Sequence, residues 1–163
     1  MKTKIIQKIL VSLTAGFGVL LAITTADAQT LWALEGNLHH TRLVSITCNG
    51  GVCDIVFEGS GTVNIMGPVT VTTHVVQDFN ITPCNTGVSE ATLVGATGSI
   101  STADSCGMVC PNATHSGFPN TINTVWNVTG GTGEFSGITG SGTDQGTIAG
   151  NGPNVRLSGI VVY

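Results

Sequence analysis

The sequence predicts an all-β fold, a closed eight-stranded antiparallel β-barrel. From Gln29 onward, short apolar runs are separated by Gly, Asn, Ser and Pro, and the clearest runs alternate apolar and polar residues with the period of a strand. Residues 130–143 contain six glycines in fourteen positions, which no helix would tolerate. The runs are too closely spaced for crossover helices, so the sheet should be antiparallel, and closure into a barrel would remove its edges.

The first 28 residues predict a cleaved secretory signal peptide. Three lysines lie among the first eight residues, Ile9–Thr24 is apolar, and Ala26-Asp27-Ala28 fits a small-x-small cleavage site. An uncleaved anchor helix is the alternative, but the apolar stretch is shorter than the ~20 residues that a membrane span needs. Residues 29–163 would then form one domain of a secreted or periplasmic protein.

The apolar runs predict eight or nine strands. In the first, Trp32, Leu34 and Leu38 share one face, whereas Glu35, Asn37 and His39 share the other. The predicted strands are Leu31–His40, Leu43–Cys48, Val52–Phe57, Pro68–Ile81, Ser89–Ser101, Thr121–Thr129, Phe135–Ser141, Asp144–Gly150 and Val155–Tyr163. Asn49-Gly50 predicts a type I′ hairpin turn between the second and third runs, because both residues readily adopt positive φ. A second tight turn is expected at Gly130–Gly133, leading into a strand with a high glycine content.

Five cysteines favour disulfides in an exported protein. Cys48 and Cys53 flank the predicted hairpin turn and could clip its two strands together. Cys106 and Cys110 bracket three residues of a segment expected to be irregular, and Cys84 is left over, so Cys84 could instead pair with either of them. A zinc site or free thiols are alternatives, although neither pair has the two-residue spacing common in structural zinc sites.

Charge and motifs exclude several function classes. After signal cleavage the only permanent cations are Arg42 and Arg156, against eight acidic residues, so nucleic acid and anionic membrane surfaces are not expected partners. Gly131-Thr132-Gly133 lacks both the third glycine and the βαβ unit of a dinucleotide site, and there is neither a P-loop nor a Gly-x-Ser-x-Gly elbow. No cofactor and no metal site is predicted.

Catalytic candidates are few. His39 and His40 are adjacent, so in a strand they point to opposite faces and cannot line one site together. If the barrel lumen performs acid/base chemistry, the sequence offers Glu35, His39, His74 and Glu134 as candidates. Exposed or structural histidines are the simpler interpretation.

The glycine-rich stretch resembles the signature of the allene oxide cyclase and dirigent-like β-barrels, a Gly-Gly-Thr-Gly turn followed by Phe-x-Gly-x-x-Gly-x-Gly-Thr. The resemblance covers about residues 88–161. Its signature positions, which would be structural, are Gly130, Gly131, Gly133, Phe135, Gly137, Gly140 and Gly142. It implies an eight-stranded barrel, often a homo-oligomer, whose apolar lumen holds a small hydrophobic molecule. In the plant cyclases the lumen steers ring closure by its shape, assisted by a carboxylate, and in dirigent proteins it orients radicals.

Three functions follow as hypotheses. The first is a secreted barrel that binds a small apolar molecule in its lumen or serves as an envelope-associated interaction module. The second is a cyclase or isomerase; Glu35 lies on the first strand, where the cyclases keep their carboxylate, but points outward if Leu34 and Leu38 point inward. The third is a small outer-membrane barrel, suggested by the alternating last strand that ends on Tyr163 and opposed by the low number of aromatic residues.

Overall fold

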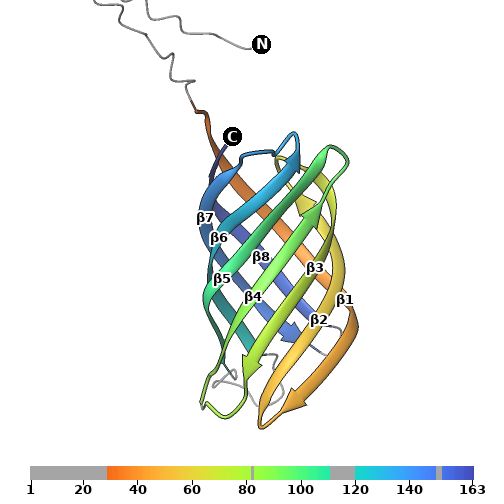
Figure 1. Cartoon of the computed structure of the whole chain (residues 1–163), viewed down its shortest axis with the longest axis vertical. Coiled ribbons are helices and arrows are strands. Elements are labelled where there is room, and N and C mark those ends of the chain that lie inside the picture. Colours follow the sequence, from red (N-terminus) through yellow and green to blue (C-terminus); the bar gives the residue numbers. More distant parts are fainter. Residues whose placement is uncertain (1–28, 82, 111–119, 150–151) are drawn as a thin grey trace, which may run out of the picture.

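The computed structural model describes residues 29–81, 83–110, 120–149 and 152–163, and it confirms the predicted fold class. Eight antiparallel strands follow one another around a closed barrel, each paired with the next along the chain, and the last strand pairs with the first (Figure 1). The strands are β1 Leu31–Asn49, β2 Val52–Val63, β3 Gly67–Asp78, β4 Asn85–Val94, β5 Gly98–Cys110, β6 Asn120–Gly133, β7 Thr139–Ala149 and β8 Gly152–Val162. Among the described residues no helix is long and apolar enough to cross a membrane. The predicted signal peptide lies outside the described residues.

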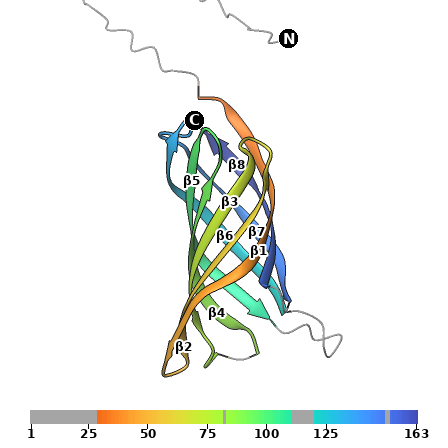
Figure 2. The ribbon, with the colours of Figure 1, turned by 90° about the vertical axis from the view of Figure 1, so that its right-hand side faces the viewer.

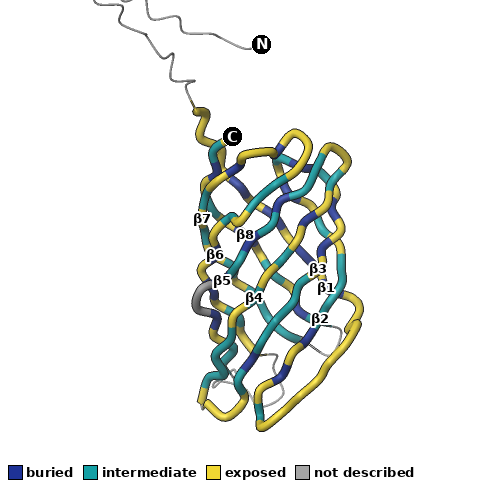
Figure 3. The backbone as a smooth tube through the Cα atoms, viewed as in Figure 1, coloured by how far each residue is buried: buried dark blue, intermediate teal, exposed yellow. Residues whose placement is uncertain are grey.

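Alternation along each strand separates the lumen from the outer surface. In β1, Leu34 and Leu38 are buried, whereas Glu35 and His39 are exposed, as the sequence predicts. The same alternation of buried and exposed positions runs along the other strands (Figure 3). Because successive side chains of a strand point to opposite faces, the buried apolar side chains of these strands face the lumen.

The start of β1 and the end of β8 lie at the same end of the barrel (Figure 2), here called the upper end. Apolar side chains fill the lumen there. Met66 from the β2–β3 turn and Phe135 and Ile138 from the β6–β7 turn are buried there. The ring of Tyr163 contacts that of Phe135 edge to face, with centroids 5.4 Å apart. The core comprises Leu34, Leu38, Val63, Met66, Val69, Val71, Leu93, Ile100, Trp126, Phe135, Ile138, Leu157 and Val161.

Two glycines make room for the largest core side chain, Trp126, which is fully buried. A Cβ atom added at Gly142 of β7 or Gly159 of β8 would lie within 2.4 or 2.5 Å of the indole Cζ2. This distance is far shorter than van der Waals contact, so any larger residue would displace the ring or the strands. Gly142, a signature position, therefore has a packing role.

Several predicted element boundaries were wrong. The first two predicted strands are one strand, β1, which continues through irregular pairing after His40. The predicted strand Ser89–Ser101 is interrupted between Val94 and Gly98, where the chain turns from β4 into β5. The cysteine-containing segment that was expected to be irregular belongs to β5. The predicted strand Pro68–Ile81 ends at Asp78 as β3.

The glycine-rich turn lies four residues later than predicted. β6 extends through Gly133, which has a φ of 62°, and the turn spans 134–137, ending at Gly137 with a φ of 80°. Because positive φ favours glycine, the signature residues Gly133 and Gly137 are suited to form this turn. Phe135 therefore lies in the turn and fills the upper end of the lumen, whereas the predicted strands Phe135–Ser141 and Asp144–Gly150 are replaced by β7.

The β1–β2 hairpin is closed at its tip by a disulfide between Cys48 and Cys53, as expected. Its two turn residues are Gly50 and Gly51, with φ of 59° and 85°, so the turn lies one residue beyond the predicted Asn49-Gly50.

The second disulfide joins Cys84 to Cys110, one of the pairings that the sequence left open, so Cys110 does not pair with Cys106. Cys84 and Cys110 lie at the ends of neighbouring strands, where the register places Asn85 opposite Val109. The side chain of Cys106 lies outside the described residues. Two disulfides are typical of proteins that fold in an oxidising compartment.

Candidate functional site

The lower half of the lumen, below the packed core, contains a cavity of about 110 Å³. Its walls are mostly apolar. Gln77, Val109 and Ile148 line it, and each lies one residue from the lower end of its strand, so the cavity reaches the lower end of the barrel. Among the apolar lining residues are Leu38, Phe57, Val75, Leu93, Ile122 and Val155. The volume is comparable to the ~150 Å³ cavity that holds benzene in an engineered protein.

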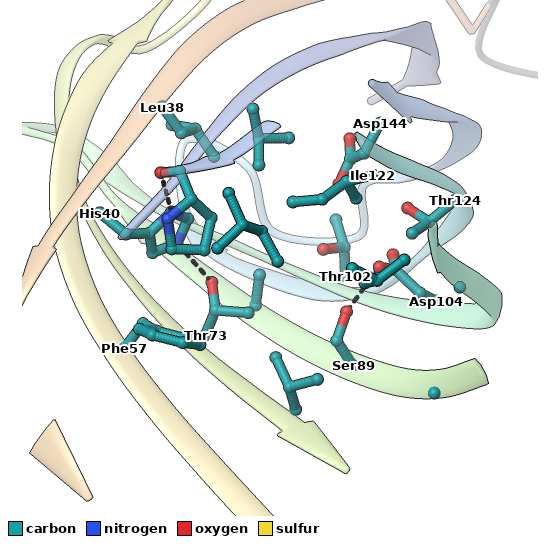
Figure 4. A pocket seen from close by; sticks show the side chains of 18 of the residues that line it. Leu38, His40, Phe57, Thr73, Ser89, Thr102, Asp104, Ile122, Thr124 and Asp144 are labelled. Atoms are coloured by element: carbon teal, nitrogen blue, oxygen red, sulfur yellow. Dashed lines mark hydrogen bonds between the residues drawn. The ribbon is translucent and has the colours of Figure 1, made fainter. Parts of the chain in front are cut away.

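Four polar side chains cross one wall of this cavity on consecutive strands: Ser89 of β4, Asp104 of β5, Thr124 of β6 and Asp144 of β7. We call this set the acidic row. The pairing register brings them together, because Ser89 lies opposite Asp104 and Thr124 lies opposite Asp144. In Figure 4, Thr124 lies between the two carboxyl groups. The Ser89 hydroxyl donates a hydrogen bond of 2.5 Å to Asp104 Oδ2.

Burial in this apolar lumen raises the pKa of both carboxyl groups. For Asp104, loss of solvation raises the pKa, opposed by the Ser89 hydroxyl and by the neighbouring Thr124. For Asp144, loss of solvation together with repulsion from Asp104 raises the pKa from 3.8 to about 8, opposed by the adjacent Trp126. Asp144 therefore holds a proton at neutral pH and can donate a hydrogen bond or a proton into the cavity.

Three buried polar atoms have no hydrogen-bonding partner in the described part of the chain. Two belong to residues that line the cavity, Thr124 Oγ1 and Asp144 Oδ1, and the third, Trp126 Nε1, lies beside Asp144. Thr124 and Trp126 lie close enough to lower the pKa values of Asp104 and Asp144, but neither makes a hydrogen bond of normal geometry to them. Buried polar atoms are nearly always paired in folded proteins. A cluster of unpaired ones beside a cavity points to a ligand or ordered water.

His40 lies on the opposite side of the cavity (Figure 4) and is 3% exposed. Its Nδ1–H donates to the carbonyl oxygen of Pro153 at 3.2 Å, which assigns the tautomer because a carbonyl can only accept. Its Nε2 then accepts a hydrogen bond from the Thr73 hydroxyl at 2.9 Å. Burial lowers the pKa of His40, so the ring is neutral and both of its nitrogens are occupied.

None of the four candidate residues named from the sequence lines this cavity. Glu35 and His39 lie on the outward face of β1, where His39 hydrogen-bonds Asn154. The outward-facing His74 forms an ion pair with Asp54 at 2.9 Å when protonated, and both side chains are about half exposed. Glu134 is exposed in the β6–β7 turn.

Sequence reasoning missed the residues that do line the cavity. For His40 a signal was present: it lies an even number of residues from Leu34 and Leu38 along the strand, so it belongs on the same, inward face of β1. Asp104 and Asp144 carry no comparable local signal, because each lies among Thr, Ser and Gly residues that look like solvated strand. Within the described residues, no group of three His, Cys, Asp or Glu side chains is arranged to hold a metal ion.

No protein-family model, curated protein or solved structure matches this chain. The similarity to allene oxide cyclases and dirigent proteins therefore stays a prediction.

Proposed function

We propose that this protein is an exported barrel that binds one small, largely apolar molecule in the lower half of its lumen. The observation that carries the proposal is the cavity of about 110 Å³, apolar on most of its surface and bordered on one side by unpaired buried polar atoms. Small-molecule sites commonly combine apolar walls with a few polar groups that set orientation. The two disulfides support export, because they favour an oxidising compartment.

The outward faces of β3 and β7 favour a function located in the lumen. The outward side chains of β7 are Thr139, Ser141, Thr143, Gln145 and Thr147, all hydroxyls or amides. Those of β3 include Thr70, Thr72, His74 and Asp78. A transmembrane barrel instead presents an apolar band to the lipid and a polar interior. The polarity here is the reverse on these strands, which does not favour the outer-membrane hypothesis.

A cyclase or isomerase activity is the second candidate, favoured by one observation. Asp144 keeps its proton near neutral pH beside an apolar cavity, as a general acid would. The test is incubation of a bound, unsaturated ligand in D2O. Deuterium incorporation that disappears in Asp144→Asn supports proton transfer, whereas no incorporation with the wild-type protein supports binding alone.

Binding itself is tested by native mass spectrometry of protein purified from the periplasm or medium, followed by thermal unfolding with probes of six to eight non-hydrogen atoms. We expect a chain cleaved near Gln29 and a Tm that rises with ligand concentration, because a ligand that binds only the folded state stabilises it.

Matched variants assign the binding to the lumen. Ala91 lines the cavity, whereas Ala103 lies between two cavity-lining residues of β5 and so faces outward. Ala91→Leu should abolish the ligand-induced rise in Tm, and Ala103→Leu should preserve it. An equal response of both variants, or no response of the wild-type protein to any probe, would overturn the proposal.

A further inference from the structure

Among the residues that the structure describes, the acidic row has no counter-charge inside the barrel. Of the described inward-facing residues, only Asp104, Asp144 and His40 can titrate, and His40 is neutral. Both arginines of the domain face outward: Arg42 binds Glu58 at 2.8 Å on the surface, and Arg156 is exposed on β8. The inward positions of β2, β3, β4, β6 and β8 that line the cavity carry apolar side chains, hydroxyls and one amide.

The row is rich in hydrogen-bond acceptors that have no partner among the described residues. Thr124 is 8% exposed, and its Oγ1 has no partner. Asp144 Oδ1 is likewise buried and unpaired. Within the described part of the chain, the hydrogen bond of normal geometry to these carboxyl groups is the one from Ser89 to Asp104. An ionised row therefore offers acceptors from three neighbouring strands to a ligand.

The chemistry of a matching ligand follows from this geometry. An ammonium group has three donors and no acceptor, so it can serve Asp104, Thr124 and Asp144 together. An alcohol has a single donor and would leave acceptors of the row unpaired. The rest of the cavity is apolar, with Phe57 and Val75 among the lining residues, and it accommodates a hydrocarbon body but no second charge.

We propose that the lumenal cavity binds a small apolar amine as its ammonium ion, with the nitrogen held by Asp104, Thr124 and Asp144 and the hydrocarbon against the apolar wall. This inference rests on the proposed lumenal binding function and specifies its ligand class. In the ligand-free protein Asp144 is protonated, which avoids two negative charges side by side in the buried row. The ammonium ion replaces that proton when it binds. Binding therefore releases a proton to solvent at neutral pH.

The test compares three ligands of nearly equal size and shape: cyclohexylmethylamine, cyclohexylmethanol and methylcyclohexane, measured by isothermal titration calorimetry. At pH 8 the amine should bind at least about tenfold more tightly than the alcohol, because a charge-assisted hydrogen bond in a buried site exceeds a neutral one by that margin or more. Calorimetry in buffers of different ionisation enthalpy should reveal proton release with the amine only.

Variants locate the ammonium. Asp144→Asn and Asp104→Asn should each weaken amine binding about tenfold or more and leave alcohol binding within about threefold. Thr124→Val removes one acceptor at constant volume and should weaken amine binding by less. Glu90→Gln is the matched control, because Glu90 is an exposed acid on the outward face of β4 and the substitution likewise replaces a carboxyl group by an amide. It should leave both affinities unchanged.

The pH profile gives an independent readout. Amine affinity should rise from pH 6 to pH 8 as the row ionises, and this rise should disappear in Asp144→Asn, whereas alcohol affinity should not rise. Equal binding of amine and alcohol, or an amine affinity that Asp144→Asn and Glu90→Gln change equally, would overturn the amine assignment and leave lumenal binding standing. Failure of all three ligands to bind would overturn both.

Discussion

Replacing Asp144 by Asn should change how the stability of the protein depends on pH. The carboxyl titrates at about 8 in the folded protein, against 3.8 in an unfolded chain. Between these values the folded state holds a proton that the unfolded state has released, so the free energy of unfolding falls as pH rises. The stabilisation is fully present below about 3.8 and is lost as pH rises through about 8. Asn is nearly isosteric and does not titrate.

The magnitude follows from the linkage slope of about 1.4 kcal/mol per pH unit for one proton. Between pH 5 and pH 8 the wild-type protein should lose on the order of 3 kcal/mol relative to Asp144→Asn. His40 acts in the opposite direction: its lowered pKa makes the folded state less stable as pH falls below about 6.5. Because both proteins contain His40, its contribution cancels in the difference.

The assay is urea unfolding at pH 5, 6, 7 and 8, followed by the fluorescence of the buried Trp126 and by circular dichroism. Glu90→Gln serves as the control for loss of an exposed carboxylate and should track the wild-type protein at every pH. A difference between wild type and Asp144→Asn that stays constant from pH 5 to pH 8 would refute the reasoning, because it would mean that Asp144 titrates normally in the folded state.

Two further predictions concern packing and covalent structure. Gly142→Ala should destabilise the protein by about 1–3 kcal/mol or more in urea unfolding, because the added methyl group meets the Trp126 ring. Gly130→Ala is the control and should change stability little, because a Cβ atom there meets nothing within 4 Å. Equal effects of the two substitutions would contradict the packing role of Gly142. Replacing Cys84 and Cys110 together by Ser should cost about 3.5 kcal/mol on the chain-entropy estimate for a separation of 26 residues, and an unchanged urea midpoint would show that this disulfide does not restrain the unfolded chain.

Local pattern was sufficient for much of the fold. Alternation in Leu31–His40 assigned Leu34 and Leu38 to one face and Glu35 to the other, and the structure has them so. Glycine density at 130–143 excluded a helix, and close spacing of the strands indicated an antiparallel sheet. The same parity places His40 inside, a step that the sequence alone would have permitted. These features depend on residues close together in the chain, where backbone geometry is the controlling factor.

What only the tertiary structure decided is which distant residues share a wall. Asp104 and Asp144 are 40 positions apart, and each alone resembles a solvated strand carboxylate. The register of β6 with β7 places Asp144 opposite Thr124, and that of β5 with β6 places Asp104 opposite Trp126, two residues along β6 from Thr124. A shift of one residue in either register would turn a whole strand over and send its acid to solvent. That register is set by packing across the lumen and by glycines that admit Trp126, and these are contacts between strands. The sequence by itself therefore determined the barrel, because the face of a strand on which a side chain lies follows from its position among neighbouring residues. Strand pairing created the acidic row, because register depends on contacts between residues far apart in the chain.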